Sequence, residues 1–167
     1  VVAVCATRTG CGKSQTTRYV AAEIKKLGKK VAVIRHPMPY GDLVKQTWQR
    51  YGCLDDLNKH KCTIEEMEEY EPHVTAGHLI FSGVDYGRIL AEAEKEADVI
   101  LWDGGNNDFS FYKPDFYITV MDPFRPTHSH EYYAGETNVR LSDYLVINKV
   151  DAVHRSGVDM VHEEIKM

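Results

Sequence analysis

The sequence predicts an α/β fold with a doubly wound, mostly parallel sheet. Three observations support this prediction: short β-branched runs alternate with helical stretches, a glycine-rich segment separates the first run from the first helical stretch, and no repeat or low-complexity linker breaks the pattern. The chain has 167 residues, of which 43% are hydrophobic, which is the length and composition of one ordinary domain. We therefore expect residues 1–167 to form a single domain.

The first 35 residues predict a βαβ unit. Val1–Ala6 is a short apolar run, and Ser14–Leu27 carries apolar residues at helical spacing before Gly28. Lys30–Arg35 then forms a second β-branched run. Because parallel strands are joined by a crossover of about this length, we expect the two runs to pair in parallel through a right-handed connection.

The remaining chain divides into an insertion and a second regular region. Residues 36–77 are polar and contain three prolines, which predicts short helices over the site, one of them opened by a capping box at Thr63–Glu66. We then expect strands at His78–Phe81, Val99–Asp103, Phe116–Met121 and Tyr144–Lys149, and helices at Val84–Ala97 and from about Ser156 to Met167.

Composition excludes several classes of partner. The net charge of −5 provides no basic field for nucleic acid, and no apolar run approaches the roughly 18 residues that span a bilayer. Four cysteines without a secretory leader are typical of reduced thiols, so we expect a cytoplasmic protein that binds neither nucleic acid nor membrane. The chain starts at Val1 without a methionine and ends inside a helical pattern, so we expect a fragment whose flanking domains are missing.

The strongest chemical signal is the sequence GCGKS at residues 10–14, between the first predicted strand and helix. In a phosphate-binding loop, glycines let backbone amides surround phosphate oxygens, and the helix N-terminus adds positive potential. Lys13 would reach the β and γ phosphates, and the Ser14 hydroxyl would bind Mg²⁺. The predicted nucleotide-binding residues here are Thr9, Gly10, Cys11, Gly12, Lys13, Ser14 and Gln15.

The loop departs from the usual pattern at its first position. Thr7 stands where the common P-loop motif has glycine, and the stretch resembles the variant loop of the SIMIBI class, which includes the signal-recognition-particle, MinD and dethiobiotin-synthetase proteins. Arg8 then takes the position of the signature lysine of that class. The resemblance implies that Arg8 acts either on nucleotide held by the partner in a homodimer or on phosphate in its own chain.

A second segment, VILWDGG at residues 99–105, resembles a Walker B strand. Asp103 at the end of this strand would supply the second Mg²⁺ ligand beside Ser14. A backbone amide of Gly104 or Gly105 would sense the γ-phosphate. We count Lys13, Asp103 and Arg8 as the candidate catalytic residues.

A third segment, NKVD at residues 148–151, follows the last predicted strand and matches the guanine-reading motif of GTPases. The Asp151 carboxylate would accept hydrogen bonds from guanine N1 and N2, with Asn148 and Lys149 bracing the ring and loop. The chemistry of these four residues favours GTP. The choice between ATP and GTP stays open on the sequence.

Two further sets of cationic side chains are candidates for an anionic substrate. Arg35 and His36 follow the second predicted strand, and Arg125, His128 and Arg140 lie between the last two. Their alternative role is that of ordinary surface or turn-bracing side chains. Cysteine and histidine side chains could also bind a transition metal, but their spacings match no zinc pattern.

Several longer words of the sequence resemble the cyclic 2,3-diphosphoglycerate synthetase family, whose homologues are often labelled predicted GTPases. These words are RTGCGKSQTTR, VIRHPMPYGDL, ILWDGGNNDFSFYKPD, GETNVRLSD and NKVD, and they cover about residues 2–152. The resemblance implies a Mg²⁺-dependent, ATP-using ligase that activates a small phosphorylated acid and closes an intramolecular anhydride. The alternatives are a switch-type GTPase that acts on a partner protein and a metal-delivery GTPase.

Overall fold

The computed structural model describes residues 1–35, 41–105 and 108–166. The chain divides into two compact units: the first is formed by Val1–Thr17 with Gly104–Met167, and the second by Arg18–Asp103. Helix α1 (Lys13–Lys26) begins in the first unit and continues in the second.

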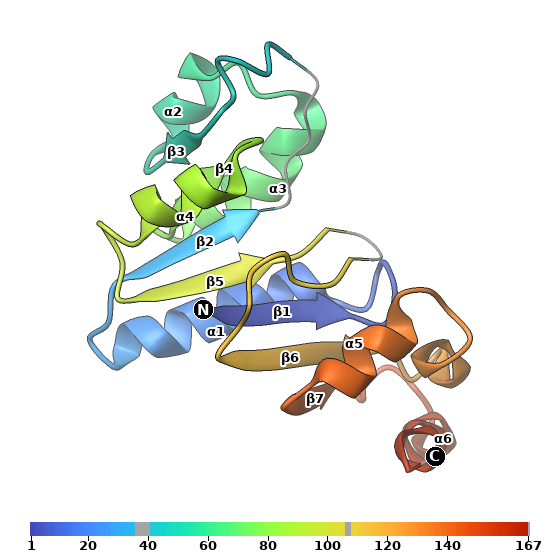
Figure 1. Ribbon diagram of the computed structural model, residues 1–167. Coiled ribbons are helices and arrows are strands. Elements are labelled where there is room, and N and C mark those ends of the chain that lie inside the picture. Colours follow the sequence, from blue (N-terminus) through green and yellow to red (C-terminus); the bar gives the residue numbers. More distant parts are fainter. Residues whose placement is uncertain (36–40, 106–107, 167) are drawn as a thin grey trace. The chain divides into compact units, whose positions relative to one another are not determined.

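The first unit contains a three-stranded parallel sheet with the order β1-β6-β7 (Figure 1). The strands are β1 (Val2–Ala6), β6 (Phe116–Met121) and β7 (Tyr144–Ile147). Strand β6 is central and buried from its second residue to its last, which explains its continuous apolar sequence, since parallel strands are covered on both faces. The 3-10 helix η1 (Pro126–Ser129) and helix α5 (Gly135–Leu141) lie between β6 and β7, and helix α6 (Arg155–Ile165) follows β7.

The second unit contains a four-stranded sheet in which three strands are parallel. Its order is β3-β4-β2-β5, with β2 (Val31–Arg35), β4 (Leu79–Ser82) and β5 (Val99–Asp103) parallel and β3 (Gln49–Tyr51) antiparallel at the edge. Its helices are α2 (Leu54–Lys59), α3 (Ile64–Thr75) and α4 (Tyr86–Ala93). Figure 1 shows α4 in front of β2 and β4, both of which it contacts.

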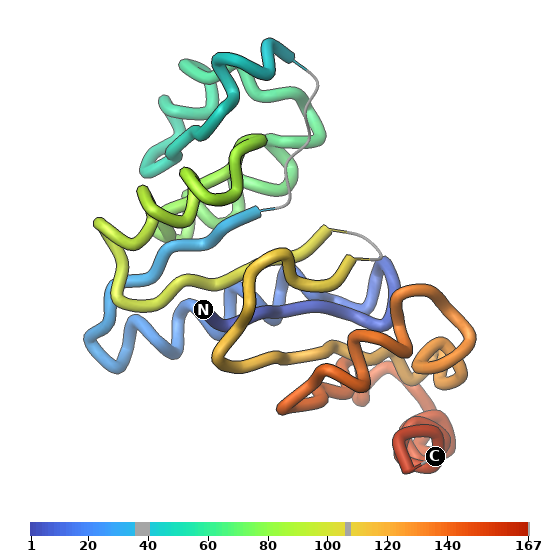
Figure 2. Tube along the Cα trace, in the orientation of Figure 1, coloured from blue at the N-terminus to red at the C-terminus, as the bar shows by residue number. Residues whose placement is uncertain are grey.

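The path from β3 through α2 and α3 to β4 can be followed in Figure 2. The predicted capping box opens α3: the Thr63 hydroxyl accepts from the Glu66 amide at 3.2 Å, and the Glu66 carboxylate accepts from the Thr63 amide at 2.8 Å. Side chains that fill the core of this unit include Tyr51, Tyr70 and Trp102, each with 0% exposure.

The prediction of an α/β fold with a mostly parallel sheet is confirmed by both units. The bounds of β5 and β6 match the expected strands. The expected helix 84–97 is shorter: it begins at Tyr86, where the Asp85 side chain caps it by accepting from the Arg88 amide at 3.0 Å, and it already ends at Ala93. Strand β3 and helix α5 were missed. Within the described residues, no helix combines the length and apolar character that a membrane crossing requires.

Candidate functional site

The glycine loop joins β1 to α1 at the carboxyl end of β1. Gly10 and Gly12 have φ values of +86° and +98°, and Lys13 is the first residue of the 14-residue helix α1. The first turn of α1 contains no acidic residue of its own, which favours an anion at the positive end of the helix. Lys13 and Ser14 are half-buried, and Thr9, Gly10 and Gln15 are exposed.

Asn148 fastens the end of β7 to this loop. Its Nδ2 atom donates to the Cys11 carbonyl at 2.8 Å, across 137 residues of sequence. A Cβ atom built at Gly12 would lie 2.0 Å from the same Nδ2 atom, so the close approach requires glycine. The Cys11 side chain is buried beneath the loop, its Sγ atom 3.5 Å from the Thr7 hydroxyl, and burial raises the pKa of its thiol.

Lys149 and Asp151 follow Asn148 but have different environments. Lys149 has a φ of +56°, and its Nζ atom is 2.8 Å from Oδ2 of the buried Asp122 at the end of β6. This ion pair holds the turn after β7 against the turn after β6. Asp151 is exposed, which leaves its carboxylate accessible to a ligand.

Arg8 lies over an aromatic pair contributed by the segment around η1. Its Cζ atom is 5.6 Å from the centre of the Tyr132 ring, and Tyr132 stacks on His128 with 5.0 Å between centroids and 3° between planes. Burial, then the charges of Arg8 and Arg125, lower the pKa of His128. Two predicted cationic candidates, Arg8 and His128, are therefore brought together through an aromatic residue that the sequence analysis did not select.

The segment that carries Tyr132 packs tightly against the glycine loop. At Gly135 an added Cβ atom would lie 2.2 Å from the His128 carbonyl oxygen and 2.9 Å from the Thr7 carbonyl oxygen. The backbone of α5 therefore passes directly over the start of the loop. The Gly104 amide donates to the Val4 carbonyl of β1 at 3.4 Å, so this amide already has a backbone acceptor within the first unit.

Asp103 occupies a buried charged cluster in the second unit. Its side chain has 0% exposure and accepts a hydrogen bond from Nη1 of Arg35, which is 3% exposed. The other end of the Arg35 guanidinium donates to Glu69 on α3. Register explains the first pair, because Arg35 and Asp103 are opposite each other in the β2–β5 ladder. Arg35 was predicted as a binder of anionic substrate, and the structure surrounds it with carboxylates of its own unit.

Two buried histidines extend this cluster. The Nε2 atom of His73 lies 3.4 Å from Oδ2 of Asp103, and its Nδ1 atom lies 3.4 Å from Nδ1 of His78. Burial, followed by the charges of His73, Lys25 and Arg18, lowers the pKa of His78 to about 4. The sequence did not signal this pair, because neither histidine belongs to a motif, and His78 was expected only as the first residue of the strand His78–Phe81.

The other candidates are more dispersed. Arg140 forms an exposed ion pair with Glu136 at 2.8 Å, and exposed Arg125 donates to the Phe124 carbonyl at 2.9 Å. Gly105 is half-buried. His36 lies outside the described residues. Within the described part of the chain, no group of three or more His, Cys, Asp or Glu side chains could hold a metal ion.

Asn138 is the main structural residue that the sequence analysis missed. It is fully buried, its Nδ2 atom donates to the Ala6 and Asp108 carbonyls at 3.0 and 2.9 Å, and its Oδ1 atom accepts from the Tyr117 hydroxyl at 2.7 Å. A single side chain thus joins the end of β1 to the segment after β5 and to β6. The only feature of the sequence that pointed to Asn138 was its place in the segment GETNVRLSD, residues 135–143.

The amino-acid sequence of the chain is similar to that of a protein from Thermococcus kodakarensis. It is 58% identical over 166 residues to the protein named Arginine synthetase ArcE of Thermococcus kodakarensis, and the aligned region covers 99% of this chain. The same region covers 37% of that protein, so the chain spans well under half the length of the relative. No protein-family profile matches the chain.

This relative corrects the functional prediction. The kinship inferred with the cyclic 2,3-diphosphoglycerate synthetase family is wrong, and so are the predictions of an anhydride-forming synthetase and of a switch-type or metal-delivery GTPase, since the relative carries the name of an arginine synthetase. The physical reason is that loop and strand-end motifs describe phosphate binding, which many reactions share, and do not identify the substrate. The name of the relative supports an enzyme of ligase type.

Proposed function

We propose that this chain is the nucleotide-phosphate-binding part of an amino-acid synthetase that makes arginine or a closely similar amino acid. The observation that carries the proposal is the glycine loop, in which two glycines with positive φ lead into the N-terminus of α1. The class of product comes from the name of the 58% identical relative. Because the chain covers 37% of that relative, the amino-acid substrate and any flanking domains are part of the proposal.

The residues of the loop fit a triphosphate. Lys13 and Ser14 are in the first turn of α1, whose own sequence contains no acidic residue that would repel phosphate. Asn148 fixes the Cys11 carbonyl, which keeps the loop in one conformation before ligand arrives. We therefore assign phosphate contacts to residues 9–15, with Lys13 neutralising charge that develops during phosphoryl transfer.

Mg²⁺ and ATP or GTP are the proposed cofactor and nucleotide. The Ser14 hydroxyl is the proposed metal ligand, and bound Mg²⁺ would neutralise charge on the phosphate oxygens. Asp103 remains a candidate ligand from its position at the end of β5, although Arg35 already engages its carboxylate. Arg8, held over Tyr132 of its own chain, is proposed to contact phosphate in that chain, with action across a homodimer as the alternative.

The proposal is tested with the intact protein. Titration with ATP and GTP, with and without Mg²⁺, is followed by calorimetry in the parent and in Lys13→Ala. We expect Lys13→Ala to weaken triphosphate binding roughly tenfold to a hundredfold, the range for losing a charge-assisted contact. Lys29→Ala, at an exposed position after α1, is the control. Equal binding by parent and Lys13→Ala would contradict the assignment.

The ligase activity needs a separate assay. Phosphate release is measured with a panel of amino acids and an ammonia or amine donor, and we expect turnover only when an amino acid of the arginine class can form. Nucleotide hydrolysis that is indifferent to every amino acid in the panel would contradict the synthetase proposal while leaving nucleotide binding in place.

A further inference from the structure

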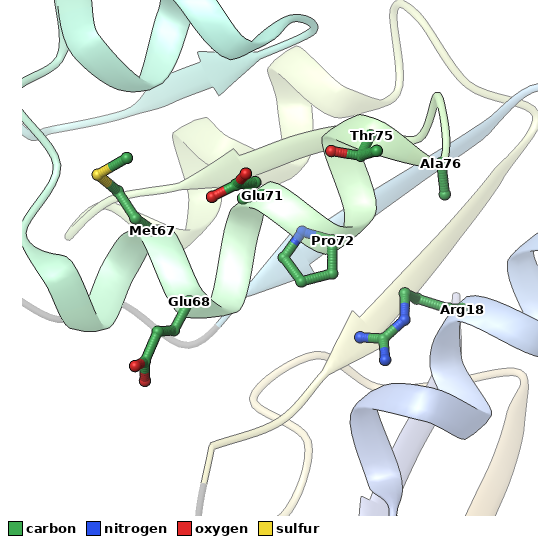
Figure 3. A pocket seen from close by; sticks show the side chains of 7 residues that line it. All are labelled: Arg18, Met67, Glu68, Glu71, Pro72, Thr75 and Ala76. Atoms are coloured by element: carbon green, nitrogen blue, oxygen red, sulfur yellow. The ribbon is translucent and has the colours of Figure 1, made fainter.

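The second unit carries a surface groove that the proposed nucleotide site does not use. Two neighbouring cavities share Arg18 of α1 and Ala76 after α3, and together we call them the α1–α3 groove. The larger, of about 560 Å³, is also lined by Met67, Glu68, Glu71, Pro72 and Thr75 (Figure 3). The smaller, of about 380 Å³, is also lined by Ala22, Lys25, Lys26 and His78.

The charges of the groove are divided between its two ends. The α3 end contributes the carboxylates of Glu68 and Glu71, one helical turn apart. The α1 end contributes the cations of Lys25 and Lys26, with Arg18 where the cavities meet. Figure 3 shows the Arg18 side chain extending from α1 toward α3. A ligand that carries a cation and a carboxylate at opposite ends would complement this arrangement.

The charged groups nearest the junction are available for a ligand. Arg18 is half-buried, and among the described residues neither Arg18, Glu68 nor Glu71 has an ion-pair partner within 4.0 Å. At the α1 end, by contrast, Lys26 pairs with Glu23 at 2.7 Å, and Lys25 donates to the Gly77 carbonyl at 3.0 Å. The two lysines at the basic end of the groove therefore already have partners in the protein, whereas Arg18 and the two glutamates form no ion pair among the described residues.

Apolar side chains line both cavities of the groove. Met67 and Pro72 line the larger cavity, Ala22 lines the smaller, and Ala76 lines both. An alkyl stem between the charged ends of a ligand would lose water against these side chains. The positive surroundings of the α1 end are also felt by His78, whose pKa is lowered by burial first and then by His73, Lys25 and Arg18.

We propose that the α1–α3 groove is a binding site for an amino acid with a cationic side chain, its side-chain cation on Glu68 and Glu71 and its carboxylate on Arg18. A guanidinium suits the acidic end because it can donate two parallel hydrogen bonds to a carboxylate. The choice of arginine as the ligand rests on the proposed function, whereas the charge pattern requires only a cation and a carboxylate on an apolar stem.

The test uses three ligands that differ at one end each. Binding of L-arginine, agmatine, which lacks the carboxylate, and L-citrulline, in which a neutral urea replaces the guanidinium, is measured by calorimetry on the intact protein without nucleotide. We expect L-arginine to bind roughly tenfold more tightly than either analogue, since each analogue leaves one end of the groove unpaired.

Variants assign each end. Glu68→Gln with Glu71→Gln should remove the preference for arginine over citrulline, and Arg18→Gln should remove the preference for arginine over agmatine. Glu65→Gln, exposed in the first turn of α3 and outside the groove, is the matched control and should preserve both preferences. Thermal melts of every variant establish that the fold is retained.

The outcomes separate this proposal from the proposed function. The groove site is overturned if arginine does not bind, or if it binds equally well to the groove variants. This conclusion holds even when the nucleotide binds the parent protein and fails to bind Lys13→Ala. If agmatine binds as tightly as arginine and Arg18→Gln does not change its affinity, the ligand is a simple amine and the amino-acid assignment is overturned. Arginine binding with both expected losses supports the groove, even if the nucleotide assignment fails.

Discussion

The Nδ2 atom of Asn148 donates to the carbonyl of Cys11 at 2.8 Å, which ties the turn after β7 to the loop after β1. The two residues are separated by 137 positions, so this contact forms only when the sheet of the first unit has assembled. The geometry of the glycine loop thus depends on a residue near the end of the described chain. Two predictions follow from the lack of space between Asn148 and Gly12.

Gly12→Ala should destabilise the first unit by about 1–3 kcal/mol, because the φ of +98° is strained for alanine and the new Cβ would overlap Asn148. Chemical denaturation measures the loss. Gly28→Ala is the control, since its φ is +76° but nothing lies within 4 Å of an added Cβ, and it should cost only the backbone strain of about 1 kcal/mol. Similar losses in both variants would show that the contact with Asn148 has no energetic weight.

The stability losses of Gly12→Ala and Asn148→Ala should be less than additive when the two substitutions are combined. Removing the amide opens the space that the new Cβ needs, so the double variant should lose less than the sum of the single variants by about 0.5–3 kcal/mol, the range for residues in contact. A double-mutant cycle measures this coupling. Additive losses would indicate that backbone strain alone accounts for the cost of Gly12→Ala.

Arg35→Gln should destabilise the second unit by about 3–5 kcal/mol, because the buried Asp103 carboxylate would lose the guanidinium cation that pairs with it. Arg50→Gln is a matched control, since Arg50 pairs with Glu96 at 2.7 Å with both side chains near 40% exposed, and its loss should cost under about 1 kcal/mol. Unfolding in denaturant separates the two values. A small loss in Arg35→Gln would mean that Asp103 becomes protonated or solvated at little cost.

His78 should make folding stability depend on pH between about 4 and 6.5. Its pKa falls to about 4 in the folded chain, through burial and the nearby His73, Lys25 and Arg18, and lies near the ordinary value of about 6.5 in the unfolded chain. The unfolded chain therefore binds the extra proton in this window, so stability falls as pH drops, by on the order of 3 kcal/mol in total. The difference between parent and His78→Gln across this window measures it, with the exposed His162→Gln as control. Parallel curves would contradict the prediction.

Asp151→Asn should distinguish the two candidate nucleotides. The exposed Asp151 carboxylate can accept from both N–H donors of guanine, whereas adenine offers only acceptor nitrogens at the corresponding positions. If GTP binds, the substitution should weaken it by about 1–3 kcal/mol, or roughly tenfold to over a hundredfold, and should leave ATP nearly unaffected. Parallel titrations of parent and variant provide the measurement. Equal changes for both nucleotides would remove Asp151 from the base contact.

The strands were predictable because parallel strands are buried on both faces and leave continuous apolar runs. Val99–Asp103 and Phe116–Met121 read this way and were placed at their observed bounds. Strand β3, with the sequence QRY, has no such run, because it is an antiparallel edge strand of three residues. Helix α5 was missed for a similar reason, since its seven residues include glycine and asparagine and too few apolar positions for a helical period.

The candidate site was predictable only where local sequence determines geometry. The strand, loop and helix around Gly12 follow from glycines and the start of a helix, which are encoded by neighbouring residues. The contacts that fix this geometry, from Asn138 to the Ala6 carbonyl and from Arg8 to Tyr132, join distant positions and leave no periodic signal. The substrate was the least predictable feature, because phosphate-binding motifs are shared by enzymes of different reactions.

The facing histidines of the second unit impose a correlation between tautomers. Two Nδ1 atoms 3.4 Å apart make a hydrogen bond only if one ring carries a proton there and the other does not. The Asp103 carboxylate, 3.4 Å from Nε2 of His73, favours the proton on that nitrogen, which leaves Nδ1 of His73 as the acceptor and makes His78 the donor. The unprotonated nitrogen of His78 is then Nε2. A carboxylate at the end of β5 thus selects which nitrogen of a groove-lining ring can take up a proton.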